Sequence, residues 1–117
     1  MRALAIRFYI GLSKSDDADL FRAVPVSIRN GTYRDRAQKA KTILSKTYPS
    51  FTALDAHGYW EGLSEPALVV EVIREDGELE RAAAAALAAE LALQLGQRSV
   101  GLAFAPVQFE FVEAGDR

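Results

Sequence analysis

The octapeptide DAHGYWEG, residues 55–62, gathers the side chains of this chain that could do chemistry. It contains the only histidine, His57, with Asp55 before it and Tyr59 and Glu61 after it. An imidazole that a carboxylate orients can act as a general acid or base near neutral pH. The ring of Tyr59 could form one wall of a binding site. One hypothesis is therefore a small enzyme centred on His57, Tyr59 and Glu61.

A structural interpretation of the same stretch is favoured over catalysis. Gly58 and Gly62 suit a bulge or turn between two strands, and Tyr59 and Trp60 are amphipathic rings that suit a sheet edge. In an extended strand His57 and Tyr59 share one face whereas Trp60 lies on the other, so the group need not converge. The sequence also lacks a nucleophile motif and a phosphate-binding glycine loop. We therefore assign no catalytic residue, and enzymatic activity is left uncertain.

Length and composition predict one globular domain, residues 1–117. Half of the residues are apolar and 26% are charged, which is the balance of a folded protein. The sequence has no cysteine, so disulfides, thiolate catalysis and cysteine-based zinc sites are excluded. A single histidine excludes a multi-histidine metal site within one chain. We expect neither a metal nor a cofactor.

The N-terminal residues 1–12 are apolar with two arginines, yet they do not fit a signal peptide. Arg7 interrupts the apolar run, and the residues SKSDDAD follow it in place of a small-residue cleavage site. No run approaches the roughly 20 apolar residues that span a bilayer, because Glu90 interrupts the alanine-rich segment. The predicted location is the cytoplasm, without a membrane partner.

Hydrophobic periodicity predicts six elements. In the first, Leu4, Ile6 and Phe8 alternate with smaller or polar residues, as in a strand with one face on a core. Turn and cap residues bound the two helices: the pair Asn30-Gly31 with Thr32 before the first, Asp76 and Gly96 around the second. The predicted elements are a strand at 3–12, a helix at 33–47, strands at 50–60 and 66–75, a helix at 77–95 and a strand at 99–113. A short helix near residue 20 is a further possibility.

This order, β-α-β-β-α-β, predicts a ferredoxin-like α+β fold, with a four-stranded antiparallel sheet and both helices on one face. The other face, here called the open face, is then left uncovered by the chain. Alternation places five residues on it: Arg7, Tyr9, Val69, Glu71 and Ile73. We expect a second copy to cover this face as a homodimer. The favoured function is a non-catalytic homo-oligomeric interaction or regulatory module.

Charge is distributed unevenly along the chain. Residues 1–50 carry ten basic and four acidic residues (+6), and residues 51–117 carry four and twelve (−8). The predicted helix at residues 33–47 has a basic side, formed by Arg34, Arg36, Lys39, Lys41 and Lys46. An ordinary solvated face explains it most simply. The alternative is an accessory protein that binds nucleic acid or another anionic partner through this helix.

A family resemblance rests on the run YPSFTALDAHGYWEGLSEPALVVEVI, with the strand IRFYIGL before it and LGQRSVGLAF after it. An aromatic-proline corner leads to a strand, then to Gly-x-Trp, a short connection with a glutamate, and a hydrophobic strand. Over residues 48–104 this pattern resembles small uncharacterised bacterial and phage-type α+β proteins. The resemblance supports the fold and implies no catalytic residue, because such families generally have no established activity.

Overall fold

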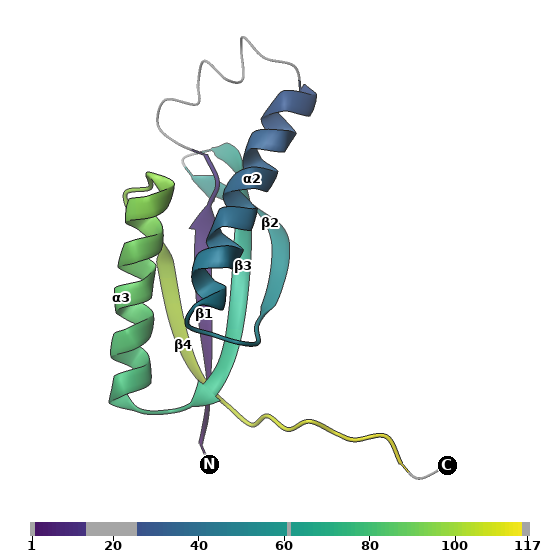
Figure 1. Ribbon diagram of the computed structural model, residues 1–117, viewed down its shortest axis with the longest axis vertical. Helices are drawn as coiled ribbons and strands as arrows, with labels where there is room; N and C mark the ends of the chain where they lie inside the picture. Colours follow the sequence, from purple (N-terminus) through teal and green to yellow (C-terminus); the bar gives the residue numbers. More distant parts are fainter. Residues whose placement is uncertain (1, 14–25, 61, 116–117) are drawn as a thin grey trace.

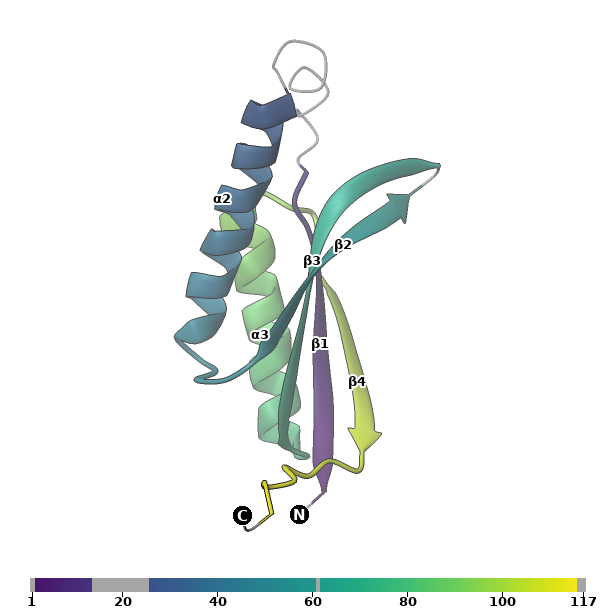
Figure 2. The same cartoon turned by 90° about the vertical axis from the view of Figure 1, so that its right-hand side faces the viewer.

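The computed structural model describes residues 2–13, 26–60 and 62–115. Its elements are β1 (Ala3–Gly11), α2 (Val26–Ser45), β2 (Thr52–Trp60), β3 (Leu63–Glu75), α3 (Glu78–Leu95) and β4 (Gly101–Val107). The strands form one antiparallel sheet in the order β2-β3-β1-β4, and both helices lie on the same side of it (Figures 1 and 2). The ferredoxin-like prediction is confirmed. The possible helix near residue 20 lies outside the described residues.

The central strand β1 sets which residues face the helices. Leu4, Ile6, Phe8 and Ile10 are fully buried, and they alternate with Arg7 and Tyr9 on the other side. In β3 the residues paired with Ile6, Phe8 and Ile10 are also fully or almost fully buried: Val72, Val70 and Leu68. Period-2 alternation on two neighbouring strands therefore places one apolar face under the helices.

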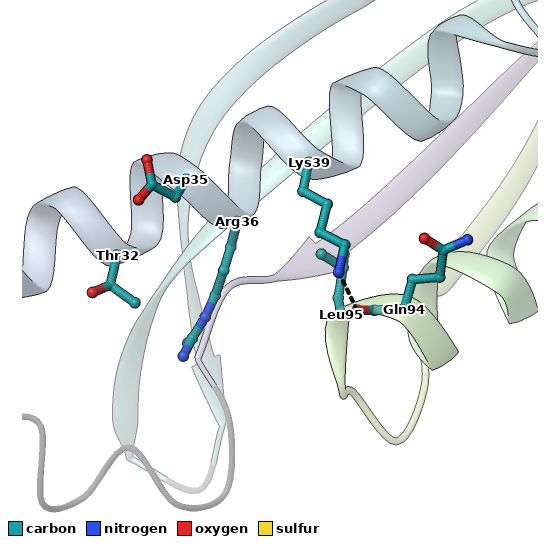
Figure 3. Close-up of a pocket in the computed structure, with 6 residues that line it drawn as sticks. All are labelled: Thr32, Asp35, Arg36, Lys39, Gln94 and Leu95. Carbon is teal, nitrogen blue, oxygen red and sulfur yellow. Dashed lines mark hydrogen bonds between the residues drawn. The ribbon is translucent and has the colours of Figure 1, made fainter.

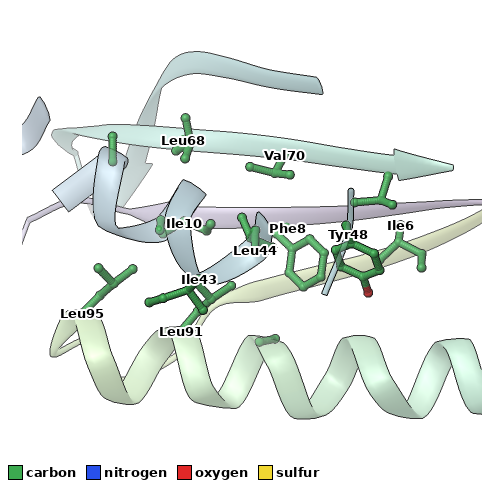
Figure 4. Close-up of a cluster of buried hydrophobic side chains, with 14 of the residues drawn as sticks. Ile6, Phe8, Ile10, Ile43, Leu44, Tyr48, Leu68, Val70, Leu91 and Leu95 are labelled. Atoms are coloured by element: carbon green, nitrogen blue, oxygen red, sulfur yellow. The ribbon is translucent and has the colours of Figure 1, made fainter. Parts of the chain in front are cut away.

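The helices close the core from one side (Figure 4). From α2 the buried side chains are Tyr33, Ala37, Ala40, Ile43 and Leu44, with Tyr48 just beyond the helix; from α3 they are Ala84, Ala88, Leu91, Ala92 and Leu95. Spacings of three and four residues put each set on one side of its helix. The buried alanines of α3 are small, which allows this helix to lie close to the sheet.

The start of α2 corrects the sequence interpretation. Asn30 and Gly31 were expected to form a turn, with Thr32 as the cap, but the helix already includes Val26 and continues through them. A glycine inside a helix costs about 1 kcal/mol relative to alanine. Packing of the buried side chains further along the helix outweighs that local preference.

The two ends of α3 show one confirmed and one wrong prediction. Gly96 ends the helix in the left-handed conformation, at φ 66° and ψ 32°, and its backbone N–H reaches the carbonyls of Ala92 and Leu93. At the other end the N-cap is Gly77, without a side-chain cap. Asp76 instead accepts hydrogen bonds from the Arg81 guanidinium at 3.0 and 3.2 Å. The arginine therefore takes the carboxylate that was expected to cap the helix.

The last strand is shorter than predicted. It ends at Val107, which pairs with Ala3, the first residue of β1. Because β1 begins there, no neighbouring strand is available for the residues that follow. Residues 108–115 form an irregular C-terminal arm that leaves the sheet (Figure 1). No helix in the described ranges is long and apolar enough to cross a membrane.

Candidate functional site

The five residues predicted for the open face lie on it, opposite the helices. Arg7 pairs with Glu71, Tyr9 with Val69, and Ala5 with Ile73 across β1 and β3. The Arg7 Nε donates to the Glu71 carboxylate at 2.7 Å, and this hydrogen bond raises the pKa of Arg7 above its usual value. The middle of the open face therefore carries an ion pair whose two charges neutralise each other.

Small residues surround Tyr9 and Glu65 on the open face, and this surface is here called the floor. By strand register it includes Gly11 on β1, Ala56 and Gly58 on β2, Ala67 on β3 and Gly101 on β4. Tyr9 is 46% exposed at the side of the floor. A Cβ atom at Gly101 would lie 3.1 Å from the Tyr9 Cβ, so glycine makes room for the ring's attachment to the strand. The open face thus offers an aromatic ring next to bare backbone.

Glu65, on β3, lies across this floor between two glycines. A Cβ atom at Gly11 would lie 2.7 Å from Glu65 Oε1, and one at Gly58 would lie 3.7 Å from Glu65 Cγ. The side chain is partly buried. Within the described residues no cation or hydrogen-bond donor pairs with its carboxylate. The glycines at positions 11 and 58 therefore leave room for the Glu65 side chain, and no described residue neutralises its carboxylate.

Glu65 and Tyr9 together suit a ligand that joins a positive charge to a flat ring. A partly desolvated carboxylate attracts a cation, and the face of a tyrosine ring accepts either a cation or a second ring. Val69, which pairs with Tyr9, is four residues from Glu65 along β3, or about 13 Å. The described residues contain no group of three or more histidine, cysteine, aspartate or glutamate side chains that could hold a metal ion.

The residues of the octapeptide lie elsewhere. His57 and Tyr59 are exposed on the outer half of β2, where they pair with Pro66 and Ser64, and Tyr59 is 76% exposed. Their side chains belong to the helix side of the sheet, opposite Glu65. The β2–β3 hairpin leans away from the helices there (Figure 2). Glu61 lies outside the described residues, and the remaining two candidates are not enclosed by any described element.

The turn of this hairpin fits part of the structural interpretation. Gly62 has φ 79°, a left-handed conformation that favours glycine, and it separates β2 from β3. Gly58 is not at the turn but inside β2, opposite Glu65. The two glycines therefore serve different purposes, one for backbone conformation and one for space.

The basic side of α2 is divided between structural and exposed positions. Arg36 donates to the Leu12 carbonyl at 2.6 Å, and Lys39 donates to the Gln94 carbonyl at 3.0 Å. Both line a pocket of about 230 Å³ with Thr32, Asp35 and Leu95 (Figure 3). Arg34 and Lys46 are exposed and Lys41 is partly buried. Two of the five predicted cations thus join α2 to β1 and α3, and a ligand-binding role for the set stays a prediction.

A second pocket, here called the α3 groove, has a volume of about 560 Å³ and lies between α3 and the start of β4. Its lining residues are Ala85, Ala88, Ala89, Ala92, Leu93, Gln97, Arg98, Ser99, Val100 and Leu102. Neither pocket includes a residue of the open face.

Three solved structures share this fold. A phage SAM lyase in the apo state matches with a TM-score of 0.56 and 16% identity, over 96% of this chain and 94% of that one. A phage SAM lyase in complex with S-methyl-5'-thioadenosine matches with a TM-score of 0.55 and 17% identity, over 89% and 81%. A de novo designed protein, Foldit4, matches with a TM-score of 0.51 and 11% identity, over 91% and 99%. No protein-family model and no curated protein matches the chain.

These neighbours correct the favoured function. A non-catalytic interaction or regulatory module was predicted, but two matching structures that cover most of the chain are of a phage SAM lyase, which is an enzyme by name. The prediction rested on the lack of a recognisable catalytic motif in the sequence. Glu65 was not among the predicted site residues.

Proposed function

We propose that this chain is an enzyme that cleaves S-adenosylmethionine, or a closely similar sulfonium compound, on the open face of its sheet. The observation that carries the proposal is the carboxylate of Glu65, which has no partner among the described residues, beside a floor of small residues that also carries the exposed ring of Tyr9. The fold shared with a phage SAM lyase supports the choice of substrate. In this arrangement Glu65 attracts the cationic end of the substrate and Tyr9 contacts its adenine.

The chemistry of a sulfonium fits the groups that the chain possesses. When the bond between sulfur and the amino-acid side chain breaks, its electron pair goes to sulfur, and S-methyl-5'-thioadenosine leaves as a neutral thioether. In one route the substrate's own carboxylate oxygen forms a new bond to the carbon that sulfur leaves, which gives a lactone. In the other route the neighbouring carbon loses a proton, which gives an alkene. The leaving group needs no acid, and the first route needs no protein nucleophile. In the second route Glu65 would accept the proton.

The open face needs a cover for this reaction, because exclusion of water strengthens a carboxylate's attraction for a cation. A single chain leaves Tyr9 and the apolar residues beside it exposed or partly exposed. We propose that a second copy supplies the cover, as a homo-oligomer through the open face. Ile73→Asp places a charge on this face away from Glu65. Light scattering should then give a smaller assembly than wild type, and an unchanged mass would contradict association through this face.

The direct test is turnover of S-adenosylmethionine by the purified chain, with S-methyl-5'-thioadenosine quantified by chromatography. Glu65→Gln keeps the size of the side chain and removes its charge, so turnover should fall about 100-fold or more, the usual scale for losing one preorganised charged or polar contact. Glu90→Gln, at an exposed position on α3, is the matched control and should retain wild-type turnover. No product from wild-type protein, together with no thermal shift from S-methyl-5'-thioadenosine, would refute the proposal.

A second variant separates the position of Glu65 from its charge. Gly11→Ala places a methyl group 2.7 Å from the position of Glu65 Oε1, so the flexible carboxylate must move away. Stability should change little, whereas turnover should fall. Gly31→Ala is the matched control, because nothing lies within 4 Å of its added Cβ. Equal turnover in the two glycine variants would show that the place of the Glu65 carboxylate does not matter.

A further inference from the structure

The C-terminal arm carries apolar side chains that its own chain does not cover. Phe109 is 44% exposed, Phe111 is 88% exposed and Val112 is 84% exposed. The two rings contact each other edge to face, with centroids 5.1 Å apart. Two adjacent exposed aromatic rings and a valine form the kind of patch that soluble proteins reserve for a partner.

The α3 groove is an apolar site without an occupant from the described part of its own chain. Leu93 lines it and is 76% exposed. Leu79, Ala86 and Leu93 follow one another at intervals of seven residues, so they lie along one side of α3, and Leu79 is 87% exposed. The groove therefore adjoins an exposed apolar stripe along the same helix.

The arm is directed away from the groove of its own molecule. The groove is at the start of β4, next to Val100 and Leu102, whereas the arm begins after Val107 at the other end. Leu102 and Val107 are about 17 Å apart along the strand. Phe111 is only four residues past Val107, so even a fully extended return reaches at most about 14 Å. The arm also leaves toward the opposite side of the molecule from α3 (Figure 1).

The charges of the two surfaces are complementary. The arm carries Glu110 and Glu113 beside its apolar residues. Arg98 lines the groove, is exposed, and forms no ion pair with a described carboxylate. An acidic segment with two phenylalanines matches an apolar groove that has one arginine at its side.

From these observations we infer that the C-terminal arm of one copy docks in the α3 groove of a second copy, with Phe109 and Phe111 in the groove and the arm's glutamates near Arg98. Arm and groove are different surfaces, so the copies either exchange arms in a closed assembly or continue as an open chain. It is separate from the open face and does not depend on the proposed reaction.

Two variants test the contact in the full-length protein. An arm variant, Phe109→Ser with Phe111→Ser, changes residues beyond the last strand, and a groove variant, Leu93→Asp, changes an exposed residue. Neither alters the core, which circular dichroism and thermal unfolding would verify. At micromolar concentration, wild type should form an assembly larger than one chain by light scattering. Each variant alone should form a smaller assembly.

Mixing the two variants gives the decisive measurement. The arm variant keeps an intact groove and the groove variant keeps an intact arm, so together they can form one arm–groove contact. With Ile73→Asp added to every chain to remove association through the open face, a tagged arm variant should retain the groove variant on a column, whereas it should not retain untagged arm variant in excess of background. A monomeric wild type, wild-type mass for either variant, or no retention of the mixed pair would overturn the inference. If Ile73→Asp reduces the mass but neither the arm variant nor the groove variant does, association uses only the open face and the inference is overturned.

Discussion

The two faces of the sheet treat their side chains in opposite ways. On the covered face Leu4, Ile6 and Phe8 are fully buried under α2 and α3. On the open face of the same β1 strand, Arg7 remains partly exposed and needs Glu71 as a partner. The covered face repeats large apolar side chains, whereas the open face mixes charged residues, the ring of Tyr9, the exposed Leu54 and glycines. Stability is thus concentrated on one face, which leaves the composition of the other free for a ligand or a partner.

The largest expected difference between the faces is the cost of removing an isoleucine. Ile6→Ala leaves a cavity under the helices and should lower the free energy of unfolding by about 3 kcal/mol. Ile73→Ala on the open face should cost less than about 1 kcal/mol in dilute protein. Urea denaturation of both variants measures the two values. Equal losses would mean that the open face contributes to stability as much as the core.

A buried polar group on the covered face provides the next test. Tyr48 is 1% exposed, and its hydroxyl has no hydrogen-bond partner among the described residues. Tyr48→Phe removes this unsatisfied group and keeps the ring that packs near Phe8. The variant should be as stable as wild type or more stable by up to about 1 kcal/mol. A loss of stability would reveal a hydrogen bond to this hydroxyl.

The same tyrosine predicts a dependence on alkaline pH. Burial raises the pKa of Tyr48, with a further contribution from Glu80, while Arg74 lowers it. The folded state therefore resists ionisation that the unfolded chain undergoes near pH 10. The stabilisation is fully present below that pH and is lost as pH rises toward the folded pKa. The decrease in stability above pH 10 should be weaker in Tyr48→Phe than in wild type, as measured by denaturation at several pH values.

A helix that forms the covered face can itself be strengthened. Gly31 lies inside α2, and an added Cβ atom meets nothing within 4 Å. Gly31→Ala should raise stability by about 0.5–1 kcal/mol, because alanine loses less backbone entropy in a helix. Gly62→Ala, at φ 79°, makes the same chemical change where alanine is strained and should be destabilising. Thermal unfolding of the pair checks both signs.

The smallest effect should come from the ion pair on the open face. Both side chains of the Arg7–Glu71 pair are 38% exposed, and exposed pairs contribute little because water and salt screen them. Arg7→Met should barely change stability, and the small difference should vanish as salt concentration rises. A large loss that persists in high salt would mean that the pair is shielded by a covering molecule.

The parts of the fold that were predictable depend on local patterns. Alternation in β1 identified the strand and both of its faces. This pattern lies within a single strand, so it can be recognised without knowing which strand pairs with it. Gly96 marked the end of α3 because a left-handed cap favours glycine. The start of α2 was missed because buried residues several turns away outweighed the turn preference of Asn30 and Gly31.

The site was harder to predict because it depends on three strands at once. Gly11 is far from Gly58 and Glu65 in the sequence, and each of the three is unremarkable alone. Only the register of β1, β2 and β3 shows that both glycines adjoin the same carboxylate. The end of β4 has a similar origin, since Val107 is the last residue that β1 can pair. Both the site around Glu65 and the end of β4 therefore depend on strand pairing. Hydrophobic periodicity does not encode this pairing, so neither was predicted.

The β2–β3 hairpin extends past the last β1 residue, Gly11, which pairs with Ala67. Beyond Ala67 the β3 strand no longer pairs with β1, so its remaining residues form a two-stranded ribbon with His57–Trp60 of β2. Such a ribbon has little stability of its own in water, so its backbone amides should exchange with deuterium by local opening, well before those of the four-stranded part. The exchange boundary should fall near Ala67. Protection that spreads beyond it when copies associate would report, amide by amide, how far a neighbour reaches along the hairpin.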